Sequence, residues 1–256
     1  MSEVTILKIG GSVLTDKREE GKLNQDRITK IAKEIASSDV QNLILIHGAG
    51  SFGHPIAKKF GLDASGRQNY AGAALTHEMV KELNKTIVKE LVEDGVAAMP
   101  VHPMSCAISS KGRLKEIMTA QIELMADNDV VPVIHGDVVM DLEWGTSILS
   151  GDQIVLHLAQ RLKAKRVGVG TDVDGVIDGE GRIITSITPK TFSNIKPLLT
   201  TPKGVDVTGE MSGKVSELVR LAKAGIQSYV FNASKKGNIT AFLRGNIDFG
   251  TVIRSD

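Results

Sequence analysis

Short apolar runs alternate with longer stretches in which apolar and polar residues recur with a helical period. The apolar runs predict strands at 4–9, 42–47, 97–101, 130–135, 166–171 and 228–232. The amphipathic stretches predict helices at about 26–37, 73–94, 151–164 and 212–224. This alternation predicts an α/β architecture with a mainly parallel sheet.

One apolar stripe runs along the predicted helix at 73–94, where Leu75, Met79, Leu83, Ile87 and Leu91 recur every four residues. Such a stripe is typical of core packing, and part of the helix is a candidate for the wall of a ligand site.

Two further segments, 109–115 and 138–145, combine turn residues with short extended runs and predict hairpins. We find no repeat, low-complexity tract or long polar linker, so we expect a single domain over 1–256.

Composition narrows the class of protein. The chain has 31 basic and 30 acidic residues and a net charge of +1, which argues against a nucleic-acid-binding protein with a bulk positive field. A lone cysteine, Cys106, excludes an intrachain disulfide framework and suits a reducing cytosol. No apolar run reaches the length of a membrane span. We therefore expect a soluble, cytoplasmic protein with no membrane or nucleic-acid partner.

The glycine-rich segment "GAGSFG" (48–53) matches the GxGxxG pattern of dinucleotide-binding loops. That pattern also needs a following helix and a second strand that ends in an acidic residue about 20 positions on. Here Pro55 argues against the helix, and 73–94 is predicted helical where the strand should be. Two other partial matches also fail. "GEMSGKV" (209–215) departs from a Walker A loop in its spacing, and "DVDGVIDGEG" (172–181) from an EF-hand in its ligands.

A strand that ends in glycine and leads into a helix presents free backbone N–H groups that bind anions, above all phosphate. The chain has two such turns near its N-terminus, "KIGGS" (8–12) and "HGAGSFG" (47–53). Two phosphate-sized sites beside one sheet suggest phosphoryl transfer, which needs positioning and charge neutralisation. Lys8, Lys17 and Lys214, which lie at the edges of glycine turns, are the candidate cations.

Five segments in order resemble the motifs of the amino-acid kinase superfamily: "KIGGSVLTDK" (8–17), "HGAGSFGHP" (47–55), "SGDQIVLHLA" (150–159), "GTDVDGV" (170–176) and "DVTGEMSGKV" (206–215). The resemblance covers essentially the whole chain. Within the superfamily it is greatest to the isopentenyl phosphate kinases, because of the His-Pro after the second glycine turn and the lysine nine residues after Lys8. It implies a three-layer αβα sandwich around a mainly parallel eight-stranded sheet, usually in a homodimer. It also implies the ATP- and Mg²⁺-dependent conversion of isopentenyl phosphate to its diphosphate, in isoprenoid precursor synthesis by the mevalonate route.

The resemblance also implies roles for individual residues. About 1–165 would bind the acceptor and about 166–256 the nucleotide. The catalytic residues would be Lys8, Lys17, His54, Asp152 and Lys214. Asp152 would orient Lys8 and Lys214, and Lys17 would contact the phosphoryl group during transfer. The ATP site would comprise Lys8, Gly10, Gly11, Ser12, Gly50, Gly53, Asp172, Asp174, Asp178, Gly209, Gly213 and Lys214. The acceptor would contact Ala49, Gly50, His54 and Gly145. Glu210 departs from the glycine that is usual in the family and leaves the local loop conformation open.

His54 fits an acceptor that is itself a phosphate. A phosphomonoester is already largely a dianion at pH 7, so it needs no base but does need hydrogen-bond donors that offset its repulsion from ATP. A His54 N–H that donates to a non-attacking oxygen would meet that need. His47 is as readily a structural residue as a ligand. His77, His102, His135 and His157 lack metal-ligand spacing, so we expect no protein metal site and a magnesium ion held mostly by ATP.

Two alternatives stay open at this point. One is a kinase of the same fold that acts on another small anion, such as fosfomycin. The other is a catalytically silent nucleotide-binding protein, which would have no physical need to keep Lys8, Lys17, Asp152 and Lys214 together.

Overall fold

The central sheet has eight strands within the residues that this computed structural model describes, 3–16, 18–62, 69–200 and 210–256. Their order is β10-β12-β11-β9-β1-β2-β6-β3, and only the β11–β12 pair is antiparallel. The strands are β1 (Thr5–Ile9), β2 (Leu43–His47), β3 (Ala98–Val101), β6 (Val131–His135), β9 (Arg166–Thr171), β10 (Ser186–Ile187), β11 (Ser228–Asn232) and β12 (Thr251–Ile253). The six strands predicted from apolar runs are all confirmed to within a residue.

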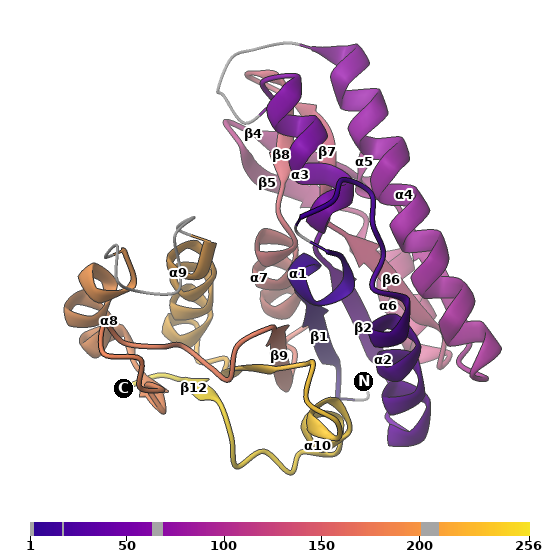
Figure 1. The fold of residues 1–256 in the computed structure, drawn as a ribbon. Helices are drawn as coiled ribbons and strands as arrows, with labels where there is room; N and C mark the ends of the chain where they lie inside the picture. The colour runs from indigo at the N-terminus through magenta and orange to yellow at the C-terminus, as the bar shows by residue number, and fades with distance from the viewer. Residues whose placement is uncertain (1–2, 17, 63–68, 201–209) are drawn as a thin grey trace.

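A second sheet, of order β5-β4-β7-β8, is built from two hairpins. Its strands are β4 (Ala107–Ser110), β5 (Arg113–Ile117), β7 (Asp137–Asp141) and β8 (Gly145–Leu149). Both predicted hairpins are thus confirmed, and β4 and β7 join them in parallel. Figure 1 shows this small sheet at one end of the molecule, near α3 (Gly50–Lys59) and α5 (Pro103–Cys106).

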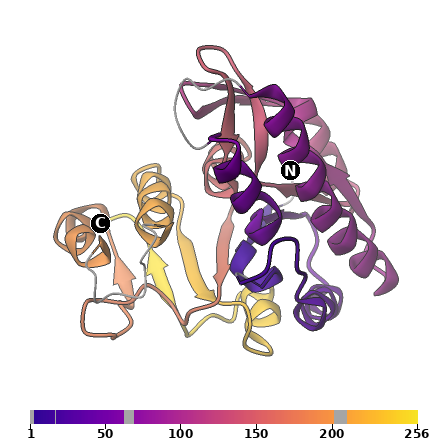
Figure 2. The same cartoon turned by 45° about the horizontal axis from the view of Figure 1, so that its top comes forward.

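Helices cover both faces of the central sheet and create two separate apolar cores. One core lies under α1 (Gly11–Leu14), α2 (Gln25–Ser38), α4 (Tyr70–Glu93) and α10 (Asn238–Arg244). The other lies under α6 (Thr119–Asp127), α7 (Gly151–Arg161) and α9 (Glu210–Lys223), with α8 (Pro189–Ile195) and the 3₁₀ helix η1 (Lys196–Thr200) beside them. The predicted three-layer αβα sandwich is confirmed. Figure 2 shows its C-terminal part, in orange and yellow, beside the N-terminal part in indigo and magenta.

Strand alternation decides where the one charged residue of β1 points. All five residues of β1 are buried, as expected for a parallel strand covered on both faces. Ile6 packs in the core under α7 and α9, whereas Leu7 and Ile9 pack in the core under α2 and α4. Because side chains two residues apart share a face, Lys8 lies on the same face as Ile6 and points toward α7.

The structure corrects the expectation that Pro55 prevents a helix after the second glycine turn. Helix α3 contains Pro55 in its interior. Proline has no N–H to bond the carbonyl four residues earlier, which is that of Ser51. The Ser51 carbonyl instead accepts from the Gly21 N–H at 3.0 Å. The objection to a dinucleotide site stands, because α4 occupies the place of the second strand.

The predicted stripe on α4 is confirmed in its second half. Leu83, Ile87 and Leu91 are buried, but Leu75 is 52% exposed. Among the described residues, the structure has no helix with both the length and the apolar character needed to span a membrane.

Candidate active site

A cavity of about 490 Å³ opens at the carboxyl ends of β1, β2 and β6. Ile9 pairs with His47, and His47 with His135, so the three strands end side by side. Each is followed by glycine, and the three turns meet at this edge of the sheet. Carboxyl ends of parallel strands are where α/β proteins commonly bind ligands.

The first two glycine turns touch each other through their backbones. A Cβ atom on Gly11 would lie 2.3 Å from the Gly50 nitrogen, and one on Gly48 would lie 2.6 Å from the Gly11 nitrogen. Gly50 also has a φ of +52°, a conformation that favours glycine. Gly11, Ser12, Ala49, Gly50 and Gly53 line the cavity, as the sequence predicted. These turns bring backbone amide groups close to the cavity, which is the environment that a phosphate needs.

A cluster of two lysines and one aspartate lies at one end of the cavity, where Lys8 and Asp152 line it. The Nζ of Lys8 lies 2.6 Å from Asp152 Oδ1, and the Nζ of Lys214 lies 3.5 Å from Asp152 Oδ2. The three side chains are 5%, 14% and 3% exposed, for Lys8, Asp152 and Lys214 respectively. The carboxylate therefore lies between two lysines that come from β1 and α9, which are far apart in the sequence.

Asp152 owes its position to the start of α7. Ser150 is the N-cap, and its side chain accepts from the Gln153 N–H at 3.3 Å. Asp152 follows in the first turn, where the helix dipole favours a negative charge. Burial alone would raise the pKa of Asp152, but the charges of Lys8 and Lys214 outweigh it and hold the pKa below its usual value. Asp152 is thus ionised at neutral pH and can orient both lysines.

His54 lies on α3, just after the second glycine turn. It is exposed and lines the cavity together with Pro55. The structure therefore brings Lys8, Asp152 and His54 around one space, as the sequence predicted.

Apolar groups form another part of the cavity wall. They are Ala57 of α3, Val80 of α4, Val138 of β7 and Ile148 of β8. Thr76, one helical turn before Val80, lines the cavity as well. The helix predicted at 73–94 does contribute to the wall, but through Thr76 and Val80 and not through the stripe that begins at Leu75. One cavity thus combines a cationic end with an apolar wall.

A network of hydrogen-bonded imidazoles begins at His135, which is buried and directly precedes the Gly136 turn. His135 Nδ1 lies 3.0 Å from the Gly136 carbonyl, and its Nε2 lies 2.9 Å from His102 Nδ1. His77 Nδ1 lies 2.9 Å from both oxygens of the Asp137 carboxylate, which also accepts from the Met104 N–H. Burial lowers the pKa of His135 to about 3. Within the described residues, we find no cluster of three groups that could hold a metal ion.

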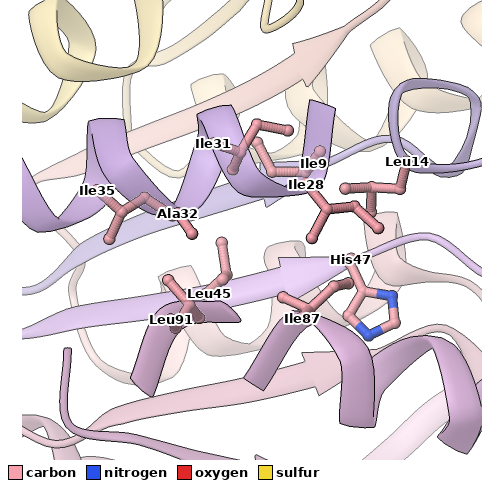
Figure 3. Close-up of a pocket in the computed structure, with 10 residues that line it drawn as sticks. All are labelled: Ile9, Leu14, Ile28, Ile31, Ala32, Ile35, Leu45, His47, Ile87 and Leu91. Carbon is pink, nitrogen blue, oxygen red and sulfur yellow. The ribbon is translucent and has the colours of Figure 1, made fainter. Parts of the chain in front are cut away.

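His47 is a structural residue at the end of β2. Its Nδ1 lies 3.0 Å from the Gly48 carbonyl, and its Nε2 accepts from the Asn84 side chain at 3.0 Å. Burial lowers its pKa to about 4. Figure 3 shows its ring at the edge of a gap of about 10 Å³ between α2, α4 and the sheet, which aliphatic side chains otherwise line. A gap of that size and character is a dry packing defect and no ligand site.

The acidic residues predicted for the nucleotide lie away from this cavity, in the C-terminal half. Asp174 bonds Lys235 Nζ at 2.8 Å and Asn232 Nδ2 at 2.9 Å. Asp178 accepts from the backbone and side chain of Arg182. Asp172 follows β9, and none of the three lines the 490 Å³ cavity.

Five other residues singled out in the sequence have different outcomes. Lys17 and Gly209 lie outside the described residues, as does the Glu210 side chain. Gly213 precedes Lys214 on α9, and Gly10 ends the ladder after β1, with its N–H donating to the Gly170 carbonyl at 2.8 Å.

Gly145 is not brought to the cavity. It is the first residue of β8, at the hairpin turn, whereas Ile148 and Leu149 at the other end of that strand line the cavity. Its φ of +76° accounts for a glycine at that turn.

Several residues that line the cavity were not predicted, namely Thr76, Val80, Gly136, Asp137, Val138, Ile148, Ser150 and Gly151. The Ser-Gly-Asp order at 150–152 was a usable signal for the helix start. The Asp137 contacts come from α4 and α5, and no local pattern indicates them.

Comparison with known proteins gives one consistent result. The model of the amino acid kinase family matches residues 3–232. The isopentenyl phosphate kinase of Methanothermobacter thermautotrophicus is 36% identical, over 97% of this chain and 98% of its own length. That of Haloferax volcanii is also 36% identical, over 99% of each chain. A crystal structure of an isopentenyl phosphate kinase superposes with a TM-score of 0.85 at 33% identity, covering 98% of this chain and 100% of its own.

Proposed function

This chain belongs to the amino acid kinase family, and on that premise we propose that it transfers the terminal phosphoryl group of ATP to the phosphate of isopentenyl phosphate. The observation that carries the proposal is the two-sided cavity, with Lys8 and Asp152 at one end, where Asp152 also pairs with Lys214, and an apolar wall at another. An acceptor with a phosphate head and a short hydrocarbon tail has that same division of polarity. The full-length similarity to isopentenyl phosphate kinases supports the same acceptor.

The mechanism follows from the charge of the reactants. Both the acceptor phosphate and the ATP phosphates are anions, so their repulsion is the main barrier to close approach. We assign Lys8 and Lys214 to the donor phosphates and Lys17 to the group in transfer, with Asp152 orienting the first two. His54 would donate a hydrogen bond to a non-attacking oxygen of the acceptor. Because the acceptor is already ionised, the site needs no general base.

The acceptor tail would lie against Ala57, Val80, Val138 and Ile148. Burial of apolar surface stabilises binding by about 25 cal/mol per Å², so a short branched hydrocarbon tail gains affinity here that a small polar anion does not. This wall is what would separate isopentenyl phosphate from other phosphate-sized acceptors.

Magnesium would arrive with ATP. The Asp152 carboxylate lies within ion-pair distance of two lysines, and the described residues offer no carboxylate or histidine cluster for a cation. We propose that ATP phosphates and water hold the ion, which would further reduce the negative charge of the donor.

We divide the chain by function into an acceptor part, about 1–165, and a nucleotide part, about 166–256. Every residue that lines the cavity lies between Lys8 and Asp152, which supports the first assignment. Asp172, Asp174, Asp178 and Gly213 belong to the second part, in which we place the nucleoside.

We further propose that the protein forms a homodimer. The edge strand β3 carries Met99, which is 50% exposed, and Val92 of the neighbouring α4 is 53% exposed. An edge strand with exposed apolar side chains is a suitable surface for a second copy. Sedimentation equilibrium of the purified protein tests this, and a monomer at micromolar concentration would refute it.

The test of the activity is ADP release with magnesium-ATP over a panel of acceptors: isopentenyl phosphate, dimethylallyl phosphate, fosfomycin, acetylglutamate and no acceptor. We expect rapid turnover with isopentenyl phosphate. Turnover with fosfomycin or acetylglutamate instead would show that the protein is a kinase of another acceptor, and it would refute isopentenyl phosphate as the substrate. ATP binding without turnover of any acceptor would refute the activity.

A further inference from the structure

A side-chain connection links the β4–β5 hairpin to both helices of the charged cluster. The hairpin turn runs through Lys111 and Gly112 into β5, which begins at Arg113. Figure 1 shows β5 above α7, with α9 beside α7. The hairpin therefore lies close to the helices that carry Asp152 and Lys214.

The first link joins the hairpin to α7. The Gln153 Oε1 accepts from the Leu114 N–H at 2.9 Å, and the Gln153 Nε2 donates to the Gly112 carbonyl at 3.1 Å. Gln153 directly follows Asp152. These two hydrogen bonds to backbone groups fix the hairpin relative to the residue between the two lysines.

The second link joins the hairpin to α9. Both terminal nitrogens of Arg113 donate to the Glu217 carboxylate, at 2.6 and 3.0 Å. This is the paired geometry in which a guanidinium holds a carboxylate in a fixed orientation. Glu217 is 12% exposed and lies three residues after Lys214, so the two side chains are neighbours on the helix surface.

We propose that Arg113 is a positioning residue for Lys214, holding α9 at the distance from Asp152 at which Lys214 meets the donor phosphates. The inference rests on the proposed function for what Lys214 contacts. Its physical basis is that the site combines Asp152 with Lys214, which lies on a different helix and 62 residues later in the chain. Rates of enzymatic reactions are sensitive to misplacement by about 1 Å, and Arg113 is the hairpin's side-chain link to that helix.

Loss of this pair should not unfold α9. Val215, Leu218, Val219 and Leu221 of the helix are buried in the core. Exposed ion pairs contribute little to folding stability, and Arg113 is 45% exposed. A change in activity without a change in stability would therefore reveal the positioning role.

The experiment compares Arg113→Ala, Glu217→Ala, the double variant and Arg113→Lys with the wild type. Arg244→Ala is the matched control. Arg244 is also an exposed arginine, but it lies on the α2–α10 side of the sheet, where it donates to the Ser37 carbonyl at 2.7 Å. We measure kcat, KM for ATP, KM for isopentenyl phosphate, melting temperature and, by calorimetry, the affinity for magnesium-ATP without acceptor.

For Arg113→Ala we expect kcat/KM for ATP and the affinity for magnesium-ATP to fall about tenfold, with the KM of the acceptor within twofold. The double variant should be no worse than either single variant, because both remove the same link. Arg113→Lys should fall between, since an ammonium cannot make the paired contact.

ATP parameters within twofold of wild type and of Arg244→Ala would overturn the proposal. So would an equal loss of ATP and acceptor affinities together with a lower melting temperature, which would mark a folding role. The ATP titration needs no acceptor. If the wild type does not phosphorylate isopentenyl phosphate, the proposed activity is refuted. The effect of Arg113→Ala on ATP affinity can still be measured and interpreted in that case.

Discussion

Asp152→Asn removes the single negative charge between two buried lysines, which makes it a direct test of the site electrostatics. At the observed 2.6 and 3.5 Å, the Coulomb attraction is about 6 kcal/mol to Lys8 and about 5 kcal/mol to Lys214, with an effective dielectric constant of about 20. Much of this attraction offsets the cost of burying the charges. Removal of one partner from a buried ion pair costs about 3 to 5 kcal/mol. We expect the free energy of unfolding to fall by about 3 kcal/mol.

Chemical denaturation at pH 7.5 without nucleotide measures this loss. The matched control is Asp26→Asn, because Asp26 also lies in the first turn of a helix but is exposed. It should change the unfolding free energy by about 0.5 kcal/mol at most. Steady-state assays should show kcat of Asp152→Asn reduced by on the order of a hundredfold, because neither lysine keeps its orientation.

A second substitution separates charge from packing. Asp152→Asn combined with Lys214→Met leaves one buried positive charge in place of two, so it should recover part of the lost stability while activity stays low. A loss below about 1 kcal/mol for Asp152→Asn, or no recovery in the double variant, would refute the electrostatic reasoning.

Three further predictions concern other parts of the molecule. His54→Ala should lower turnover of the phosphate acceptor by on the order of a hundredfold, and a loss within about threefold would show that the assigned hydrogen bond is wrong. Glu34→Gln should lower the free energy of unfolding by about 1 to 2 kcal/mol in urea and leave turnover unchanged, because the Glu34 carboxylate accepts from three backbone N–H groups at the start of α10; unchanged stability would contradict this. Asp141 is buried, which would raise its pKa, but backbone N–H groups of the hairpin turns outweigh burial and lower the pKa to about 2. The pKa of Asp141 is lower in the folded than in the unfolded state, so its contribution to stability is present above about pH 4 and is lost as the pH falls toward 2. Asp141→Asn should therefore make the free energy of unfolding less dependent on pH between about 4 and 2. The same pH dependence in the variant and the wild type would contradict this.

The sheet could be predicted from the sequence because parallel strands covered on both faces are short, nearly continuous apolar runs. The apolar run at 43–47 and those of the other predicted strands can be recognised from the local sequence alone. Helix α3 could not be predicted so simply. The Ser51 carbonyl that Pro55 leaves without a helical donor accepts from Gly21, and no local pattern contains that contact.

The candidate site, too, could be predicted only in part. Motifs identified Lys8, His54 and Asp152, because each lies next to a glycine turn or at a helix start. The apolar wall could not be read from the sequence, since Val80, Val138 and Ile148 come from three elements and resemble other core residues. Gly145 was assigned to the acceptor by resemblance, and it lies at the turn of the β7–β8 hairpin, outside the residues that line the cavity.

The contact between the two glycine turns has a consequence for engineering this scaffold. Gly11 and Gly48 leave no space for even a methyl group, so any library that varies them would consist mostly of inactive clones. The wall residues Val80, Val138 and Ile148 sit on α4, β7 and β8, outside those two turns. A designer who seeks a new acceptor should therefore hold the turns constant and vary the wall, so that tail selection changes while the phosphate chemistry is inherited.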